Sequence, residues 1–116
     1  MTEEKVYSML GLAVKAGKLA SGDGVCEKYI RSGKGKLIIV AQDASLNTKK
    51  KYSDMCKYKD LDFRYFGQKE LIGKSIGKVQ RAVLVLIDEN FAKKILELAD
   101  VLDFKDLSGG EAFDKS

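Results

Sequence analysis

The 116-residue chain contains no histidine, no tryptophan and no proline, and it has only two cysteines. Without histidine it lacks the commonest general base and both the Ser-His-Asp and the Cys-His catalytic arrangements. Cys26 and Cys56 belong to no CxxC motif, and two thiols alone do not complete a tetrahedral zinc site. No pair of acidic residues has a spacing that specifies a paired-carboxylate site. We therefore expect a protein that is not an enzyme and that uses neither a cofactor nor a metal.

The chain also lacks a signal-peptide pattern, and no apolar run approaches the roughly 18 residues that a membrane span requires. We expect a soluble, cytoplasmic monomer whose thiols are reduced and buried in the core. The length is that of one domain, and a hydrophobic content of 45% is sufficient for a core.

Charge is unevenly distributed along the chain. Residues 1–81 carry 17 Lys or Arg and 9 Asp or Glu, whereas residues 82–116 carry 4 and 8. A basic body indicates a polyanionic partner such as nucleic acid, and the alternative is a solvated surface of uneven charge. The run of Lys49, Lys50 and Lys51 leaves the same two alternatives open, because three cations in the first turn of a helix oppose its dipole.

Hydrophobic periodicity predicts five helices that alternate with four strands. Residues 37–41 and 82–87 are continuous apolar runs, which are typical of strands buried on both faces. The other strands are expected at residues 18–21 and 62–66, and the helices at 3–16, between Gly24 and Gly33, from Asn47 or Thr48 to Tyr58, at 68–76, and from Asp88 to Leu102. This order predicts a three-layer α/β/α sandwich with a four-stranded mixed sheet. We expect one domain over residues 1–104 and a flexible acidic tail over residues 105–116.

Several residues in this scheme have specific expected roles. Asp88 is a good N-cap for the last helix, and Asn47 or Thr48 is expected to cap the third. The second helix is expected to bury the face that carries Val25, Cys26, Tyr29 and Ile30.

Two segments are candidates for binding a ligand. The glycine-rich turn in Gly17–Lys28 precedes a helix, where backbone N–H groups can bind an anion. It matches neither the Walker A nor the dinucleotide-binding pattern, and a simple helix-capping turn is the alternative. The second candidate is the loop of residues 77–81, in which Lys78 and Arg81 can contact phosphates, Gln80 a base edge and Val79 an exposed base. An ordinary connecting loop is the alternative there.

Several segments together carry a resemblance to a known family: GLAVKAGK at 11–18, SG at 21–22, IRSGKGKLIIVAQDAS at 30–45, NTKKK at 47–51, Gly73–Gly77 and Asp88–Lys94. Over about residues 3–102 the chain resembles the YlxQ-type bacterial members of the kink-turn RNA-binding ribosomal protein family (L-seven-Ae and L-thirty-e like). The resemblance implies an α/β/α sandwich that binds kink-turns, in which a bulge beside tandem sheared G·A pairs bends an RNA duplex. It also implies a non-catalytic, ribosome-associated protein whose partner is structured ribosomal or messenger RNA.

The resemblance implies an RNA-binding site in two parts, formed by Gly22, Asp23, Gly24, Val25 and Lys28 together with Lys78, Val79, Gln80 and Arg81. Phosphate contacts from Lys28, Arg31, Lys36, Lys78 and Arg81 are expected to make binding strongly salt-dependent.

The chain departs from the family pattern at one point. Gly24 and Val25 stand where the best kink-turn binders carry an Asn-Glu pair that contacts the G·A purine edges. Asp23 is a candidate to replace that contact by accepting from a guanine amino group. Two alternatives remain: a protein-interaction module that has lost this recognition, and a relative of the substrate-binding domain of RNA methyltransferases, which would need a partner for catalysis.

Overall fold

The computed structural model describes residues 2–108, with the backbone alone for residues 103–108. Helices and strands alternate in the predicted order. The elements are α1 (Thr2–Lys15), β1 (Leu19–Ser21), α2 (Asp23–Ser32), β2 (Leu37–Val40), α3 (Leu46–Lys59), β3 (Phe63–Tyr65), α4 (Lys69–Ser75), β4 (Val83–Leu86) and α5 (Glu89–Ser108). None of the described helices combines the length and hydrophobicity that a membrane span requires.

The four strands form one sheet in the order β1-β4-β2-β3. β4 runs antiparallel to both β1 and β2, whereas β2 and β3 are parallel. The register pairs Leu37 with Leu86 and Val40 with Val83, so the start of β2 lies beside the end of β4. The mixed four-stranded sheet confirms the predicted fold class.

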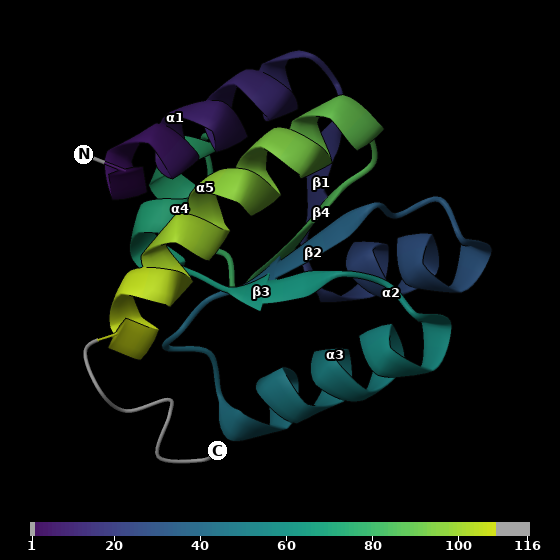
Figure 1. The fold of residues 1–116 in the computed structure, drawn as a ribbon. Helices are drawn as coiled ribbons and strands as arrows, with labels where there is room; N and C mark the ends of the chain where they lie inside the picture. The colour runs from purple at the N-terminus through teal and green to yellow at the C-terminus, as the bar shows by residue number, and fades with distance from the viewer. Residues whose placement is uncertain (1, 109–116) are drawn as a thin grey trace.

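Helices cover both faces of the sheet (Figure 1). α1, α4 and α5 lie on one face, and α2 and α3 lie on the other. Every residue of β2 and β4 is buried, because these central strands are covered from both sides. This burial explains why both strands are continuous apolar runs rather than alternating ones. The helices complete the core with side chains that include Val6, Leu10, Ile30, Tyr52 and Ile95.

The helix caps confirm one sequence prediction and correct another. The N–H of Phe91 donates to the Asp88 carboxylate at 2.9 Å, so Asp88 caps α5 as predicted. The prediction of Asn47 or Thr48 as the cap of α3 is wrong. Ser45 is the N-cap, and its hydroxyl oxygen accepts from the N–H of Thr48 at 3.1 Å. Ser45 is as good a cap type as Asn47, and the helix begins two or three residues earlier than expected.

Two further expectations differ from the structure. Val25 lies outside the buried face of α2: it is 42% exposed, whereas Cys26 and Ile30 are buried. The last helix does not end near Leu102, since α5 continues to Ser108 and includes the first residues of the expected tail. The rest of that tail, residues 109–116, lies outside the described residues.

Candidate nucleic-acid interface

The first part of the site is the start of α2, directly after β1. Gly22 is the N-cap residue with φ 106°, and its N–H donates to the carbonyl of Val83 at 3.1 Å. The first backbone bond of the helix runs from the N–H of Cys26 to the carbonyl of Gly22. The amides of residues 23–25 therefore have no acceptor within the helix and carry the positive end of its dipole. Such an N-terminus suits an anion, provided that other groups contribute to the site.

The second part is the loop of residues 76–81, between α4 and β4. The N–H of Lys78 donates to the carbonyl of Gly73 at 2.7 Å, and the N–H of Arg81 donates to the carbonyl of Lys69 at 3.0 Å. A Cβ atom on Gly73 would lie 2.5 Å from the Cα of Gln80, so only glycine lets the loop pack this closely on α4. Backbone contacts therefore hold the loop in place while the side chain of Val79 stays 86% exposed.

Gly73→Ala is expected to destabilise the fold by about 1–3 kcal/mol, because the added methyl group forces the loop away from α4. Gly24→Ala is the matched control, since a Cβ there meets no atom within 4 Å. Urea denaturation of both variants measures the difference. Equal unfolding midpoints for the two variants would show that the close approach at Gly73 does not constrain the loop.

Hydrogen bonds join the two parts. The Nε of Arg81 donates to the Ser21 hydroxyl at 3.0 Å, and Ser21 directly precedes the N-cap of α2. The bond from the N–H of Gly22 to the carbonyl of Val83, the first residue of β4, makes a second link two residues after Arg81. The structure therefore brings the two predicted segments side by side at one end of the sheet. Ser21 is a member of this arrangement that the sequence analysis did not include, since nothing in the sequence marked its pairing with Arg81.

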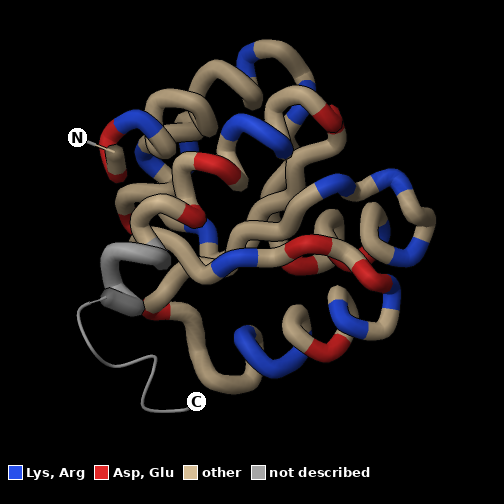
Figure 2. The backbone as a smooth tube through the Cα atoms, in the orientation of Figure 1, with Lys and Arg blue, Asp and Glu red and all other residues tan. Residues whose placement is uncertain are grey.

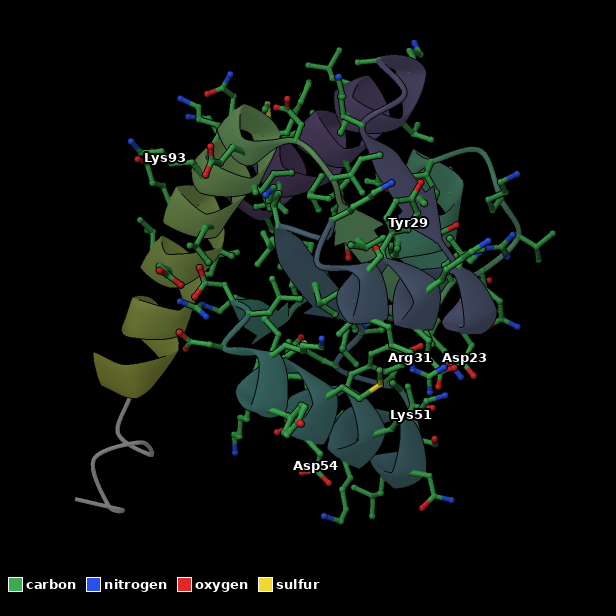
Figure 3. The ribbon with its side chains drawn as sticks, turned by 90° about the vertical axis from the view of Figure 1, so that its right-hand side faces the viewer. Asp23, Tyr29, Arg31, Lys51, Asp54 and Lys93 are labelled. Atoms are coloured by element: carbon green, nitrogen blue, oxygen red, sulfur yellow. The ribbon has the colours of Figure 1, made fainter. Side chains whose placement is uncertain are left out.

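The N-terminal half of α3 contacts the start of α2. Lys51 Nζ lies 3.1 Å from the Asp23 carboxylate and 2.5 Å from that of Glu27. The hydroxyl of buried Tyr52 donates both to the Asp23 carbonyl, at 2.7 Å, and to the Asp23 carboxylate. Figure 3 shows Asp23 and Lys51 next to each other on the two helices. The lysine run thus contributes at least one structural contact, which the sequence left undecided.

These contacts change the protonation equilibria of the residues that make them. The hydrogen bond from Tyr52, and then that from Lys51, lowers the pKa of Asp23 below its usual value. The bond from Lys51 to Glu27 raises the pKa of Lys51. Burial and the bond to Asp23 raise the pKa of Tyr52. At neutral pH Asp23 is therefore a carboxylate bound on its α3 side, and it stabilises the packing of α2 on α3.

Asp23→Asn is expected to lower the free energy of unfolding at neutral pH, with the difference vanishing in acid. A carboxyl group with a lowered pKa stabilises the folded state above its unfolded pKa, about 3.9, and this contribution is lost as the pH falls through the lower, folded value. Urea denaturation of both proteins at neutral pH and below the folded pKa tests the sign. Asp54→Asn is the control, because Asp54 pairs with Lys50 on the exposed surface and is expected to have little effect. A difference in the free energy of unfolding that stayed constant at all pH values would contradict the lowered pKa of Asp23.

Two predicted site residues have backbone positions farther from the loop than the others. α2 starts beside the loop, and its 10 residues carry Arg31 about 12 Å along the axis from Asp23. The N–H of Lys36 donates to the carbonyl of Leu86, at the end of β4 that lies away from Val83. The Arg31 side chain extends back towards the start of α2, where its guanidinium lies 4.0 Å from the Glu27 carboxylate. The phosphate contacts expected of Arg31 and Lys36 stay predictions. Lys28, in the second turn of α2, is exposed and lies on the same helix face as Gly24.

The remaining chemistry of the described residues does not suggest catalysis. Burial raises the pKa of Cys26 and of Cys56 to about 12, so both thiols stay protonated at neutral pH and are poor nucleophiles. Both are free cysteines within the core, as predicted. Among the residues whose side chains the structure describes, 2–102, there is no cluster of three potential metal ligands. The arrangement of a helix N-terminus, exposed cations and an exposed apolar side chain is suited to binding a polyanion that also carries planar groups.

Comparison with known proteins shows the family to which the chain belongs. Residues 4–97 match the ribosomal protein L7Ae/L30e/S12e/Gadd45 family, and the chain belongs to that family. Within it, the chain is 38% identical to the RNA-binding protein YlxQ of Bacillus subtilis (strain 168), over 81% of this chain and 94% of the relative. It is 42% identical to the RNA-binding protein YlxQ of Enterococcus faecium, over 84% and 93% of the two chains.

A solved structure has the same fold. It is a protein with unknown function from Bacillus halodurans C, which is 34% identical to this chain and superposes with a TM-score of 0.80. The superposition covers 83% of this chain and 97% of the other. The family expected from the sequence is confirmed, and the names of the two YlxQ relatives describe binding rather than catalysis, in agreement with a protein that is not an enzyme.

Proposed function

We propose that this protein is a non-catalytic, ribosome-associated RNA-binding protein that recognises a kinked or bulged RNA through the start of α2 and the loop of residues 76–81. The observation that carries the proposal is the direct link between these two segments, made by Arg81 with Ser21 and by Gly22 with Val83. The link forms one continuous surface that combines backbone donors with cations. The names of the YlxQ relatives support RNA as the polyanion.

Each group in this surface has a distinct role in the proposal. Lys28, Lys78 and Arg81 contact phosphates, and the free amides at the start of α2 bind a phosphate or a base edge. Val79 packs on a base that the bend exposes, because its side chain has little contact with the protein, and exposed Gln80 hydrogen-bonds to a base edge. Binding stabilises the bent RNA by the difference between its affinities for the bent and the extended form.

Asp23 has a different role in this proposal from the one that the sequence analysis considered. Its carboxylate oxygens already accept hydrogen bonds from Lys51, at 3.1 and 3.2 Å, and from Tyr52. A guanine amino group would have to compete with these donors. Asp23 therefore acts by holding the start of α2 in position, and the backbone of Gly24 and Val25 faces the RNA.

A titration with two RNAs tests the proposal. One is a kink-turn duplex, and the other is the same duplex with its G·A pairs replaced by Watson–Crick pairs. We expect tighter binding to the kink-turn. With three cations contacting phosphates, log K is expected to fall with log salt with a slope of about −3. Equal binding to both RNAs would overturn the recognition of a kink. Binding to neither at low salt would overturn RNA binding and favour a protein-interaction module.

A further inference from the structure

A second surface with the features of an RNA contact lies at the other end of α2. A groove of about 250 Å³ runs between α2 and α3, and it is lined by Ile30, Arg31, Met55, Tyr58 and Lys59. Tyr58 is 87% exposed although it stands beside the apolar side chain of Met55. An aromatic ring left this open at the edge of an apolar groove is available to stack on a planar group.

The charges around the groove favour an anionic occupant. Residues 28–42 contain four Lys or Arg and no Asp or Glu. The Arg31 side chain is 70% exposed, and the Glu27 carboxylate lies 4.0 Å from it, at the limit of an ion pair. Lys59 Nζ donates to the Arg31 carbonyl at 3.4 Å, which places a second cation at the same edge. Figure 2 shows Lys and Arg in the turn between α2 and β2, where the chain leaves this end of α2.

The acidic residues around the groove are paired or lie at its border. Glu27, 4.0 Å from Arg31, is bound by Lys51 at 2.5 Å. Asp60 is the C-cap of α3 and is exposed beyond Lys59. Asp54 forms an ion pair with Lys50 at 3.0 Å. The groove itself is lined by two cations and no carboxylate. An acidic ligand with planar groups matches this surface better than a neutral or basic peptide does.

The groove and the first part of the proposed site lie on the same helix, α2. Lys28 lies in the second turn, Arg31 follows one turn later, and the helix is about 15 Å long. A strand that leaves the first site along this helix passes Lys28 and Arg31 before it reaches Tyr58. This path gives Arg31 a place in RNA binding.

We propose that the groove between α2 and α3 binds a single-stranded RNA segment that extends from the RNA held at the first site. A base stacks on the Tyr58 ring, and Arg31 and Lys59 contact the flanking phosphates. The inference rests on the proposed RNA binding and adds a second contact that selects RNAs with an unpaired extension.

The test compares a kink-turn RNA with the same RNA carrying an extension of about six unpaired uridines at either end. For the wild-type protein, the extension at one end is expected to tighten binding by about tenfold. Tyr58→Ala is expected to remove this gain and to leave the affinity for the unextended RNA unchanged. Tyr58→Phe keeps the ring and is expected to keep the gain. Lys94→Ala, on α5 at the opposite face of the sheet, is the control and is expected to change neither affinity.

Each outcome separates this inference from the proposed function. Binding of the unextended RNA with no gain from either extension overturns the inference and leaves the proposed function standing. Tyr58-dependent binding of an oligouridine without binding of the kink-turn overturns the proposed kink-turn recognition and leaves the RNA-binding groove standing. If Tyr58→Ala lowered the affinity for both RNAs equally, Tyr58 would belong to the first site, and the inference of a separate second site would be overturned. Displacement of the Tyr58-dependent contact by polyglutamate but not by oligouridine would replace RNA with an acidic protein partner.

Discussion

Reversing both loop cations, in a Lys78→Glu and Arg81→Glu double variant, is expected to reduce RNA affinity by about a hundredfold or more. Each cation is proposed to contact a phosphate, and a hydrogen bond to a charged group contributes about 1.5–3 kcal/mol. Lys78 is exposed, so its replacement leaves the fold intact. Arg81 also donates to the Ser21 hydroxyl, and losing that bond costs about 1 kcal/mol of stability.

The measurement is the affinity of the double variant for a kink-turn RNA at several salt concentrations. The slope of log K against log salt is expected to become less steep by about 2, because two phosphate contacts are lost. Lys93→Glu with Lys94→Glu is the matched control, since it makes the same charge change at exposed positions on α5. An equal loss of affinity in the control would show that net charge, and not the position of the loop, determines binding.

Introducing the family's Asn-Glu pair is expected to increase the preference for a kink-turn over its Watson–Crick counterpart by about tenfold or more. The variant is Gly24→Asn with Val25→Glu, and each good side-chain contact with base edges contributes about 1–3 kcal/mol of discrimination. The site has room for both side chains: a Cβ at residue 24 meets no atom within 4 Å, and Val25 is 42% exposed. A Glu in the first turn also suits the helix dipole.

This prediction is tested by titrating the variant with both RNAs. The control is the double variant Gly24→Ala and Val25→Ala, which changes the same two positions without adding polar side chains. We expect the control to keep the preference of the wild-type protein. Equal tightening for both RNAs in the Asn-Glu variant would mean that the two side chains do not reach the G·A pairs. The start of α2 would then lie elsewhere on the RNA.

Local signals in the sequence were sufficient for the order of the elements. The apolar runs of β2 and β4 indicated strands covered on both faces, and Asp88 indicated the start of α5. The sequence was less informative where neighbouring residues were equivalent candidates. Ser45, Asn47 and Thr48 are all good cap residues, and their types alone do not show that Ser45 is the one that caps α3.

The candidate site was predictable only in part, for a different reason. The two segments were visible as a glycine-rich turn and a basic loop, but the contacts that assemble the site join distant residues. Arg81 and Ser21 are 60 residues apart, and Lys51 and Asp23 are 28 apart. Spacing along the chain also cannot show which end of the sheet a residue occupies: the backbone of Lys36 pairs with Leu86, at the end of β4 away from Val83.

The most direct test of the proposed interface maps the RNA contact on the protein itself. Backbone amide chemical shifts, followed by NMR during titration with a kink-turn RNA, report on the helices, strands and loops in one experiment. The largest changes are expected at residues 22–28 and 76–81, with small changes on α5. If the largest changes fell on α1 and α5 while residues 22–28 and 76–81 remained unchanged, the RNA would bind the opposite face and the proposed site would be wrong.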